Sequence, residues 1–472
     1  MLKLSRLSWL NSRQNSPKPC QERPTSPSLP NELWRKIIGF TVRLSGANSL
    51  ELDDAFSPPY LNEEYPEVED ELFRDRQSLA KVSSSWRAAV SEISAEYLVI
   101  YSGKELKGLV KKFEAQKALP GKALGEWTLR IDFRILESYK TSYVLRLLQC
   151  TPNLLIYNNR NGPANSPEHC TPPEVMKGLA LHCSRSLRRL EWSGAGEAPR
   201  YQDLVHLCNK LPHLVTLRLV ALFSFPVRAD GVPPLLPLAR LKTLSLGIIP
   251  EPTCPRPEYA VTWDPFVQYL CLHPSQLPCL EHFECDIFPL LSIVFFEMHG
   301  QKLRLFRTTA WSAEGALPQA LSLCPNLQSL VIAQGSETVD LPSFHPSLQR
   351  ICILPTVDVA VSVPQRVFDY AVLAPLDHVL KSIENMAAPH LVELRIRNMG
   401  AYMHLVDYST WLGLWWRRWN IRGVQFRDKA GGSFANVYDR EFIFISCVNG
   451  STLNLVFFIT LAREALLDSI RA

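Results

Sequence analysis

Apolar positions recur in one short pattern between about residues 120 and 430. Each copy begins with leucine or isoleucine, and apolar residues follow three and, in most copies, five places later. Because side chains alternate along a strand, these two later positions point to the same face. We therefore predict eleven short strands, each placing two side chains in a core, at steps of 21 to 43 residues. The copies begin at Leu124, Leu154, Leu187, Leu214, Leu241, Leu280, Leu303, Leu327, Leu348, Leu391 and Ile421.

Proline stands two residues before the leucine in six of these copies. Proline ends a preceding helix and favours an extended chain, so it fits the junction between a helix and a strand. Helical patterns precede several copies, at residues 174–183, 201–209, 266–272 and 317–323. A repeating unit of helix, proline turn and short strand predicts an α/β solenoid. The alternative is a globular α/β domain with leucine-rich strands, which would not need phased prolines. The prolines are Pro152, Pro212, Pro278, Pro325, Pro346 and Pro389.

This repeat resembles the leucine-rich repeat, in an irregular form with long insertions. The asparagine that many such repeats carry after the strand is mostly absent here. The resemblance implies a horseshoe-shaped solenoid over residues 121–440, whose concave strand face binds a protein target.

Two amphipathic segments precede the repeats. Pro30 suits a helix start, and Leu33, Trp34, Ile37, Ile38 and Phe40 form one apolar helical face. A second helical pattern follows at Leu79, Val82, Trp86, Ala89 and Val90. Two such short helices bury too little surface to be stable alone, so we expect them to pack on each other or on a partner.

The order Leu-Pro-x-Glu-Leu, Ile-Ile and then Leu-x-x-Val-Ser-x-x-Trp-Arg resembles an F-box, here within residues 28–100. The resemblance implies docking on a Skp-type adaptor that links the chain to a cullin–RING ubiquitin ligase. Arg87 would support the helix packing, and the alternative is a helical cap on the solenoid. The adaptor contacts that the resemblance implies are Leu29, Pro30, Leu33, Ile37, Ile38, Leu79, Val82 and Trp86.

The regions outside the repeats have distinct compositions. An insertion at about residues 45–76 divides the F-box-like halves, and its many acidic residues and prolines predict a solvated, disordered loop. A basic helix within residues 101–120, with Leu106, Leu109, Val110 and Phe113 on one apolar face, is expected to join the module to the repeats. Residues 1–27 predict a disordered tail, with a mitochondrial transit peptide as the alternative. Residues 441–472 predict a cap of two strands and a helix.

Arginines dominate the strand positions that would face the concave side. Five acidic residues share these positions: Glu126, Glu191, Glu284, Asp286 and Glu393. One hypothesis is that the arginines bind an acidic or phosphorylated protein segment. The alternative is that they pair with the acidic residues and solubilise the sheet. The arginines are Arg130, Arg160, Arg189, Arg218, Arg307, Arg350 and Arg395, followed by Arg397 and Arg427.

Motifs for catalysis or cofactor binding are absent from the sequence: it contains no glycine-rich phosphate loop, HExxH or GxSxG. Twelve cysteines without a CxxC pair predict buried, reduced thiols in a cytoplasmic and/or nuclear protein. No metal site or cofactor is expected, because Cys285 would point inward while His282 points outward. The net charge of +4 is small and decides nothing about nucleic acid. Nucleic acid is an unfavoured partner because the lysines of the basic helix are expected to form a solvated face, and no membrane span is expected. The tryptophans at 411–419 are expected to be packed.

These observations predict a non-catalytic substrate-recognition subunit of an SCF-type ubiquitin ligase. The F-box would dock on the adaptor and its cullin scaffold, and the repeats would hold the target protein. The alternative is a leucine-rich-repeat scaffold that assembles proteins without ubiquitin transfer.

Overall fold

The structure is a computed structural model of the 472-residue chain. The predicted N-terminal tail and C-terminal cap lie outside the described residues, as does Asp286. Within the described residues, no helix combines the length and the apolar character needed to cross a bilayer. The structure describes residues 29–44, 46–52, 55–56, 66–117, 122–162, 170–194, 196–222, 235–247, 264–285, 292–309, 316–334, 338–355, 365–397, 408–428 and 431–432.

Three helices form the N-terminal module: α1 (Asn31–Val42), α3 (Pro66–Ala80) and α4 (Ser84–Glu96). Their shared core contains Ile38, Val42, Ala80, Val90 and Ile93, so the two predicted halves do pack together. The interpretation of residues 45–76 as a solvated loop is wrong for its C-terminal part, which belongs to α3. The predicted second helix is also interrupted, because α4 starts anew after a separate N-cap at Ser83, whose hydroxyl accepts from the Trp86 amide.

The chain divides into two compact units, and the first contains residues 1–53 and 59–303. Its strands lie in chain order, and each strand pairs in parallel with its neighbour. They are β1 (Tyr97–Ile100), β2 (Arg130–Phe133), β3 (Ile156–Asn159), β4 (Arg189–Trp192), β5 (Thr216–Leu219), β6 (Thr243–Leu246) and β7 (His282–Cys285). The predicted mixed α/β class is therefore confirmed.

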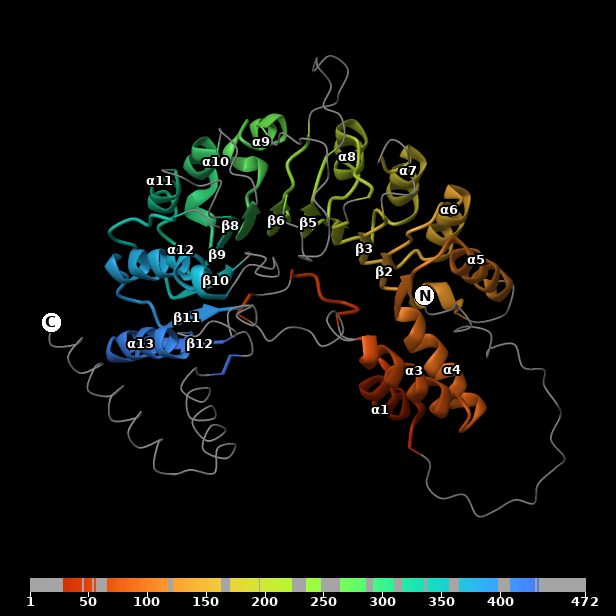
Figure 1. The fold of residues 1–472 in the computed structure, drawn as a ribbon. Coiled ribbons are helices and arrows are strands. Elements are labelled where there is room, and N and C mark those ends of the chain that lie inside the picture. Colours follow the sequence, from red (N-terminus) through yellow and green to blue (C-terminus); the bar gives the residue numbers. More distant parts are fainter. Residues whose placement is uncertain are drawn as a thin grey trace, which may run out of the picture. The chain divides into compact units, whose positions relative to one another are not determined.

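Helices return the chain from one strand to the next along one side of this sheet (Figure 1). Consecutive helices α5 to α8 pack against each other. The layer between helices and strands is apolar, with Leu190 and Trp192 of β4 fully buried. The connecting helices are α5 (Gly103–Lys117), α6 (Thr141–Cys150), α7 (Pro173–His182), α8 (Tyr201–Cys208) and α9 (Asp264–Leu270), with α10 (Ser292–His299) after β7. Short 3₁₀ turns are η2 (Leu124–Trp127), η4 (Pro274–Gln276) and η5 (Gly300–Lys302).

The second unit contains residues 54–58 and 304–472. Its five strands are again parallel neighbours in chain order. On α13, Trp415 and Trp419 are buried, which confirms the predicted packing of the tryptophan segment. The elements are β8 (Leu305–Thr309), α11 (Leu317–Ser322), β9 (Ser329–Gln334), β10 (Arg350–Pro355), α12 (Gln365–Asn385), β11 (Glu393–Ile396), α13 (Tyr408–Ile421) and β12 (Gln425–Arg427).

Nine of the eleven predicted copies have the correct register, because the strand starts two residues after the leucine. Two copies are displaced: Leu124 lies in η2, and Ile421 ends α13. The prediction also missed β1, which pairs with β2 and precedes α5. The helix α5 is therefore not a linker ahead of the sheet, although its predicted buried face is confirmed. That face consists of Leu106, Leu109, Val110 and Phe113.

Candidate functional site: a polar sheet face and an exposed apolar helix patch

The side of β2 to β7 that faces away from the helices carries one row of polar side chains. The central position of each strand lies beside the same position of its neighbour. Parallel pairing without a slip therefore aligns these side chains across six strands. The row reads Asp132, Asn158, Glu191, Arg218, Ser245 and Glu284.

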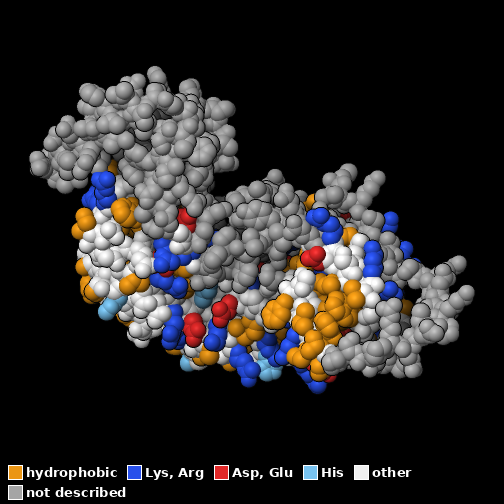
Figure 2. Space-filling model, turned by 90° about the horizontal axis from the view of Figure 1, so that it is seen from below, with side chains coloured by type: hydrophobic (Ala, Val, Ile, Leu, Met, Phe, Trp, Pro, Cys, Tyr) orange, Lys and Arg blue, Asp and Glu red, His pale blue; other side chains and the backbone are white. Residues whose placement is uncertain are grey.

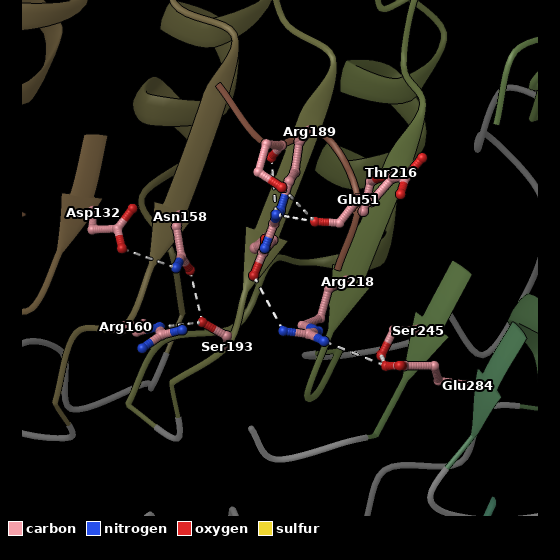
Figure 3. A network of polar contacts seen from close by, with 12 residues as sticks. Glu51, Asp132, Asn158, Arg160, Arg189, Ser193, Thr216, Arg218, Ser245 and Glu284 are labelled. Atoms are coloured by element: carbon pink, nitrogen blue, oxygen red, sulfur yellow. Dashed lines mark hydrogen bonds and ion pairs between the residues drawn. The ribbon is translucent and has the colours of Figure 1, made fainter. Parts of the chain in front are cut away.

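Ion pairs and hydrogen bonds connect this row (Figure 3). The Arg218 guanidinium lies 3.6 Å from the Glu191 carboxylate on one side and 3.4 Å from that of Glu284 on the other. Arg189 donates to Glu191, and Ser245 donates to Glu284 at 2.7 Å. All five residues are buried. The charges are therefore compensated within the protein, as buried charges must be.

Two acidic members of the row, Glu191 and Asp132, have lowered pKa values although they are buried. Burial alone would raise the pKa of Glu191, but the surrounding arginines, chiefly Arg189 and Arg218, together hold the pKa below its usual value. Asp132 behaves alike: burial is opposed by Arg130, whose Nε donates to it at 2.7 Å, and its pKa is lowered. Burial alone would lower the pKa of Arg130, but the charge and hydrogen bond of Asp132, together with Tyr97 and Glu191, raise it above its usual value.

Most of the predicted target-binding arginines are engaged within the chain. Arg130, Arg189, Arg218 and Arg395 are buried in ion pairs with Asp132, Glu191, Glu284 and Glu393. These four side chains are therefore paired with acidic residues of the chain, as the alternative interpretation predicted, and their binding of an acidic or phosphorylated target stays a prediction. The Nε atoms of Arg160 and Arg350 donate to Ser193 and Ser329, and the Nε of Arg307 has no hydrogen-bond partner among the described residues.

Asp132 is a member of the row that the sequence interpretation missed. The first copy was placed at Leu124, which put Glu126 rather than Asp132 on this face. Starting that copy at Thr128 brings Ile131 and Phe133 to the core positions, as the structure shows. Both are fully or nearly fully buried, so the apolar pattern itself contained the correct alignment.

Part of the acidic insertion lies on the strands, against the prediction of a solvated loop. We call residues 46–52 and 55–56 the inserted segment. In the first unit, Arg189 donates to the backbone oxygens of Ser49 and Glu51. In the second unit, Phe56 is buried against Val331 and Cys352. The sheet faces therefore already contact another stretch of this chain.

A second candidate surface lies on the N-terminal module. Pro30 and four apolar side chains of the predicted adaptor set are exposed there. Phe40, which was not in that set, is 92% exposed. Figure 2 shows hydrophobic side chains gathered on this part of the surface. We call this surface the apolar patch; it consists of Leu29, Leu33, Ile37, Phe40 and Val82.

The remaining predicted adaptor contacts lie beneath the patch. Ile38 is 1% exposed in the core of the module, so its prediction as a direct contact is wrong. Leu79 and Trp86 are partly buried and pack against the same core, and Trp86 lies 4.9 Å from the Trp34 ring. Arg87 donates to the Ala80 backbone oxygen, which confirms its predicted part in the packing.

Metal-ligating side chains do not gather anywhere in the described part of the chain: no three of its His, Cys, Asp and Glu residues are arranged to hold an ion. Comparison with known proteins adds no family assignment, since no family model and no curated protein matches the sequence.

Proposed function

We propose that the protein is a substrate-recognition subunit of an SCF-type ubiquitin ligase. In this proposal the N-terminal module is an F-box that docks on a Skp-type adaptor and, through it, on a cullin scaffold. The parallel strands form an irregular leucine-rich-repeat horseshoe that binds a target protein. The apolar patch on a folded three-helix module carries the proposal.

The patch has the properties of a protein-binding surface. Five large apolar side chains lie exposed on one small module, which is costly in water unless a partner covers them. Leu33 and Ile37 are four residues apart and so lie on the same face of α1. The Trp34 ring of α1 packs on the Trp86 ring of α4, and Trp86 also contacts the core of the module. The helices can therefore present the patch without rearranging, which lowers the entropic cost of docking.

The strand pattern supports the repeat assignment. Nine strands follow their leucines at the same offset, and helices lie between most successive strands. In a solenoid, each repeat leaves an apolar edge that only the next repeat covers. Such stacked strands offer a broad binding face rather than an enclosed reaction cleft.

Co-purification of the adaptor tests the proposal. The full chain should recover a Skp-type adaptor from cells, and Leu33→Ala with Ile37→Ala should lose it. These side chains are exposed, so their removal should leave folding intact. Leu181→Ala with Leu272→Ala is a matched control, because these leucines are 75% and 68% exposed on other elements. Adaptor recovery that is equal in all three would contradict the proposal and favour a scaffold without a role in ubiquitin transfer.

A further inference from the structure

The sheet faces expected to bind a target already hold the inserted segment. This segment separates α1 from α3 in the chain, and it is far from its contact partners in sequence. Arg189 and Arg397, for example, contact it across 138 to 342 residues. Such distant contacts do not follow from the local pattern, so the segment needs an explanation of its own.

In the first unit the sheet contacts the backbone of the segment. Arg130 Nη1 donates to Gly46 O at 3.1 Å, and Arg189 Nη1 donates to Ser49 O at 3.0 Å. Thr216 Oγ1 donates to Leu50 O. These acceptors are main-chain carbonyls, which every peptide carries. Residues 46–48 form a turn, in which the Ser49 amide donates to the Gly46 oxygen. Binding through main-chain carbonyls recognises the backbone of the segment without fixing its side chains.

In the second unit the sheet holds one aromatic side chain. Phe56 is 6% exposed and packs on Val331 and Cys352. The guanidinium carbons of Arg350 and Arg395 lie 4.4 and 5.9 Å from the centre of its ring. Arg397 Nη1 donates to the backbone oxygen of Ala55 at 3.2 Å. The arginines here act on an aromatic ring and a carbonyl, and neither contact needs an acidic or phosphorylated ligand.

We propose that the inserted segment is an internal, replaceable ligand: the sheet face of the first unit binds the backbone of a protein segment, and the sheet face of the second unit binds an aromatic side chain in the position of Phe56. The inference deepens the proposed function and rests on it, because it names the surface and the class of target. A tethered segment has an effective concentration on the order of millimolar, so it competes strongly with a target. A target must therefore displace it.

A peptide in trans tests this inference. In the opened chain, residues 46–58 are replaced by a glycine–serine linker of equal length, which keeps α1 joined to α3. The probe is a fluorescent synthetic peptide of residues 46–58, followed by anisotropy. We expect it to bind the opened chain at least about tenfold more tightly than the wild type, whose site is filled. A peptide with Phe56→Ala should bind the opened chain about tenfold more weakly, since it loses the buried ring.

Variants of the sheet locate the binding. In the opened chain, Arg350→Ala should weaken peptide binding, whereas Arg304→Ala should not, because Arg304 is exposed beside β8. If the opened chain does not unfold cooperatively on heating, Phe56→Ala in the complete chain takes its place and should likewise bind the peptide more tightly than wild type. No peptide binding to either folded variant, or equal binding to the wild type, would overturn the inference. The assay contains no adaptor, so its failure is distinguishable from failure of adaptor docking.

Discussion

At the scale of single residues, the side of β2 to β7 that faces away from the helices carries a network of paired charges. Glu191 lies between Arg189 and Arg218, and Arg218 also approaches Glu284. Desolvating these charges is costly, and the cost is offset only while each keeps its partners. Removing one member leaves the others buried and uncompensated. The row residues occupy the same position in each strand, so their contacts stabilise the register in which neighbouring strands pair.

Removal of the Glu191 charge tests this network. Glu191→Gln should lower the free energy of unfolding at pH 7 by about 3 kcal/mol, because Arg189 and Arg218 lose a common partner. Urea denaturation would measure the change. Glu174→Gln on α7 is the control, since that side chain is exposed and should change stability little.

The same variant should alter the dependence of stability on pH. The folded pKa values of Glu191 and Asp132 lie below their usual values. Their stabilisation is therefore complete above the unfolded pKa of about 4 and is lost as the pH falls through the folded values. Wild type should lose this stabilisation as the pH falls below about 4, and Glu191→Gln should lose less over the same range. Parallel losses in the two proteins would contradict the assigned role of Glu191.

Cysteine reactivity tests the predicted burial of the thiols. Burial raises the pKa of Cys183, Cys208 and Cys324 to about 12, so almost no thiolate forms at pH 8. Cys279 is exposed. Alkylation of the native protein, followed by mass spectrometry, should therefore modify Cys279 well before the other three. If all four cysteines of the native protein were alkylated equally fast, at the rate seen for the protein in urea, the three thiols would not be packed as described.

At the scale of elements, close packing between successive units limits side-chain size. A Cβ added at Gly125 in η2 would lie 2.3 Å from the Cys150 backbone oxygen and 2.9 Å from the Phe113 ring. These two contacts come from α6 and α5, so the glycine lets the turn approach both helices. Gly108 in α5 differs, because a Cβ there would meet nothing within 4 Å.

Paired glycine substitutions test this packing. Gly125→Ala should lower the free energy of unfolding by about 2 kcal/mol, because a backbone oxygen cannot move aside cheaply. Gly108→Ala should raise it by about 1 kcal/mol, since alanine favours a helix interior. Chemical denaturation of both variants beside the wild type would show opposite shifts. Shifts of the same sign would mean that η2 does not lie against α6.

How far the sequence predicts these elements depends on how local the signal is. The strands after Leu187, Leu214 and Leu327 were predicted in register because apolar residues stand three and five places after each leucine, as alternation along a strand requires. The strand β1 was missed because it follows α4 directly and has Ala95 where other copies have leucine. At Leu124 and Ile421, apolar residues of η2 and α13 matched the strand pattern by coincidence, so those copies were displaced.

The candidate site depended on contacts that no local pattern shows. The sequence placed arginines on the open face correctly, but composition cannot say whether they pair within the chain. The acidic insertion was interpreted from its charge and prolines, yet Leu72 and Leu79 anchor α3 to the core of the module. Phe56 reaches Cys352 across nearly 300 residues of sequence. Such tertiary contacts override local composition.

At the scale of the whole molecule, two surfaces have different chemistry. The apolar patch is uncovered, whereas the described sheet faces are occupied by the inserted segment. In the proposed function, the first surface joins the ligase and the second selects the target. The insertion links these two surfaces in the sequence, because it lies between α1 and α3 of the N-terminal module.

Direct binding between purified proteins tests the central claim, adaptor docking through the apolar patch. Isothermal titration of a Skp-type adaptor into the full chain should give a one-to-one complex. Leu33→Ala with Ile37→Ala should weaken binding at least about thirtyfold, as expected for central apolar contacts. The control, Leu181→Ala with Leu272→Ala, should bind like the wild type. No heat of binding with the wild type, or equal affinity for the patch variant, would contradict the account.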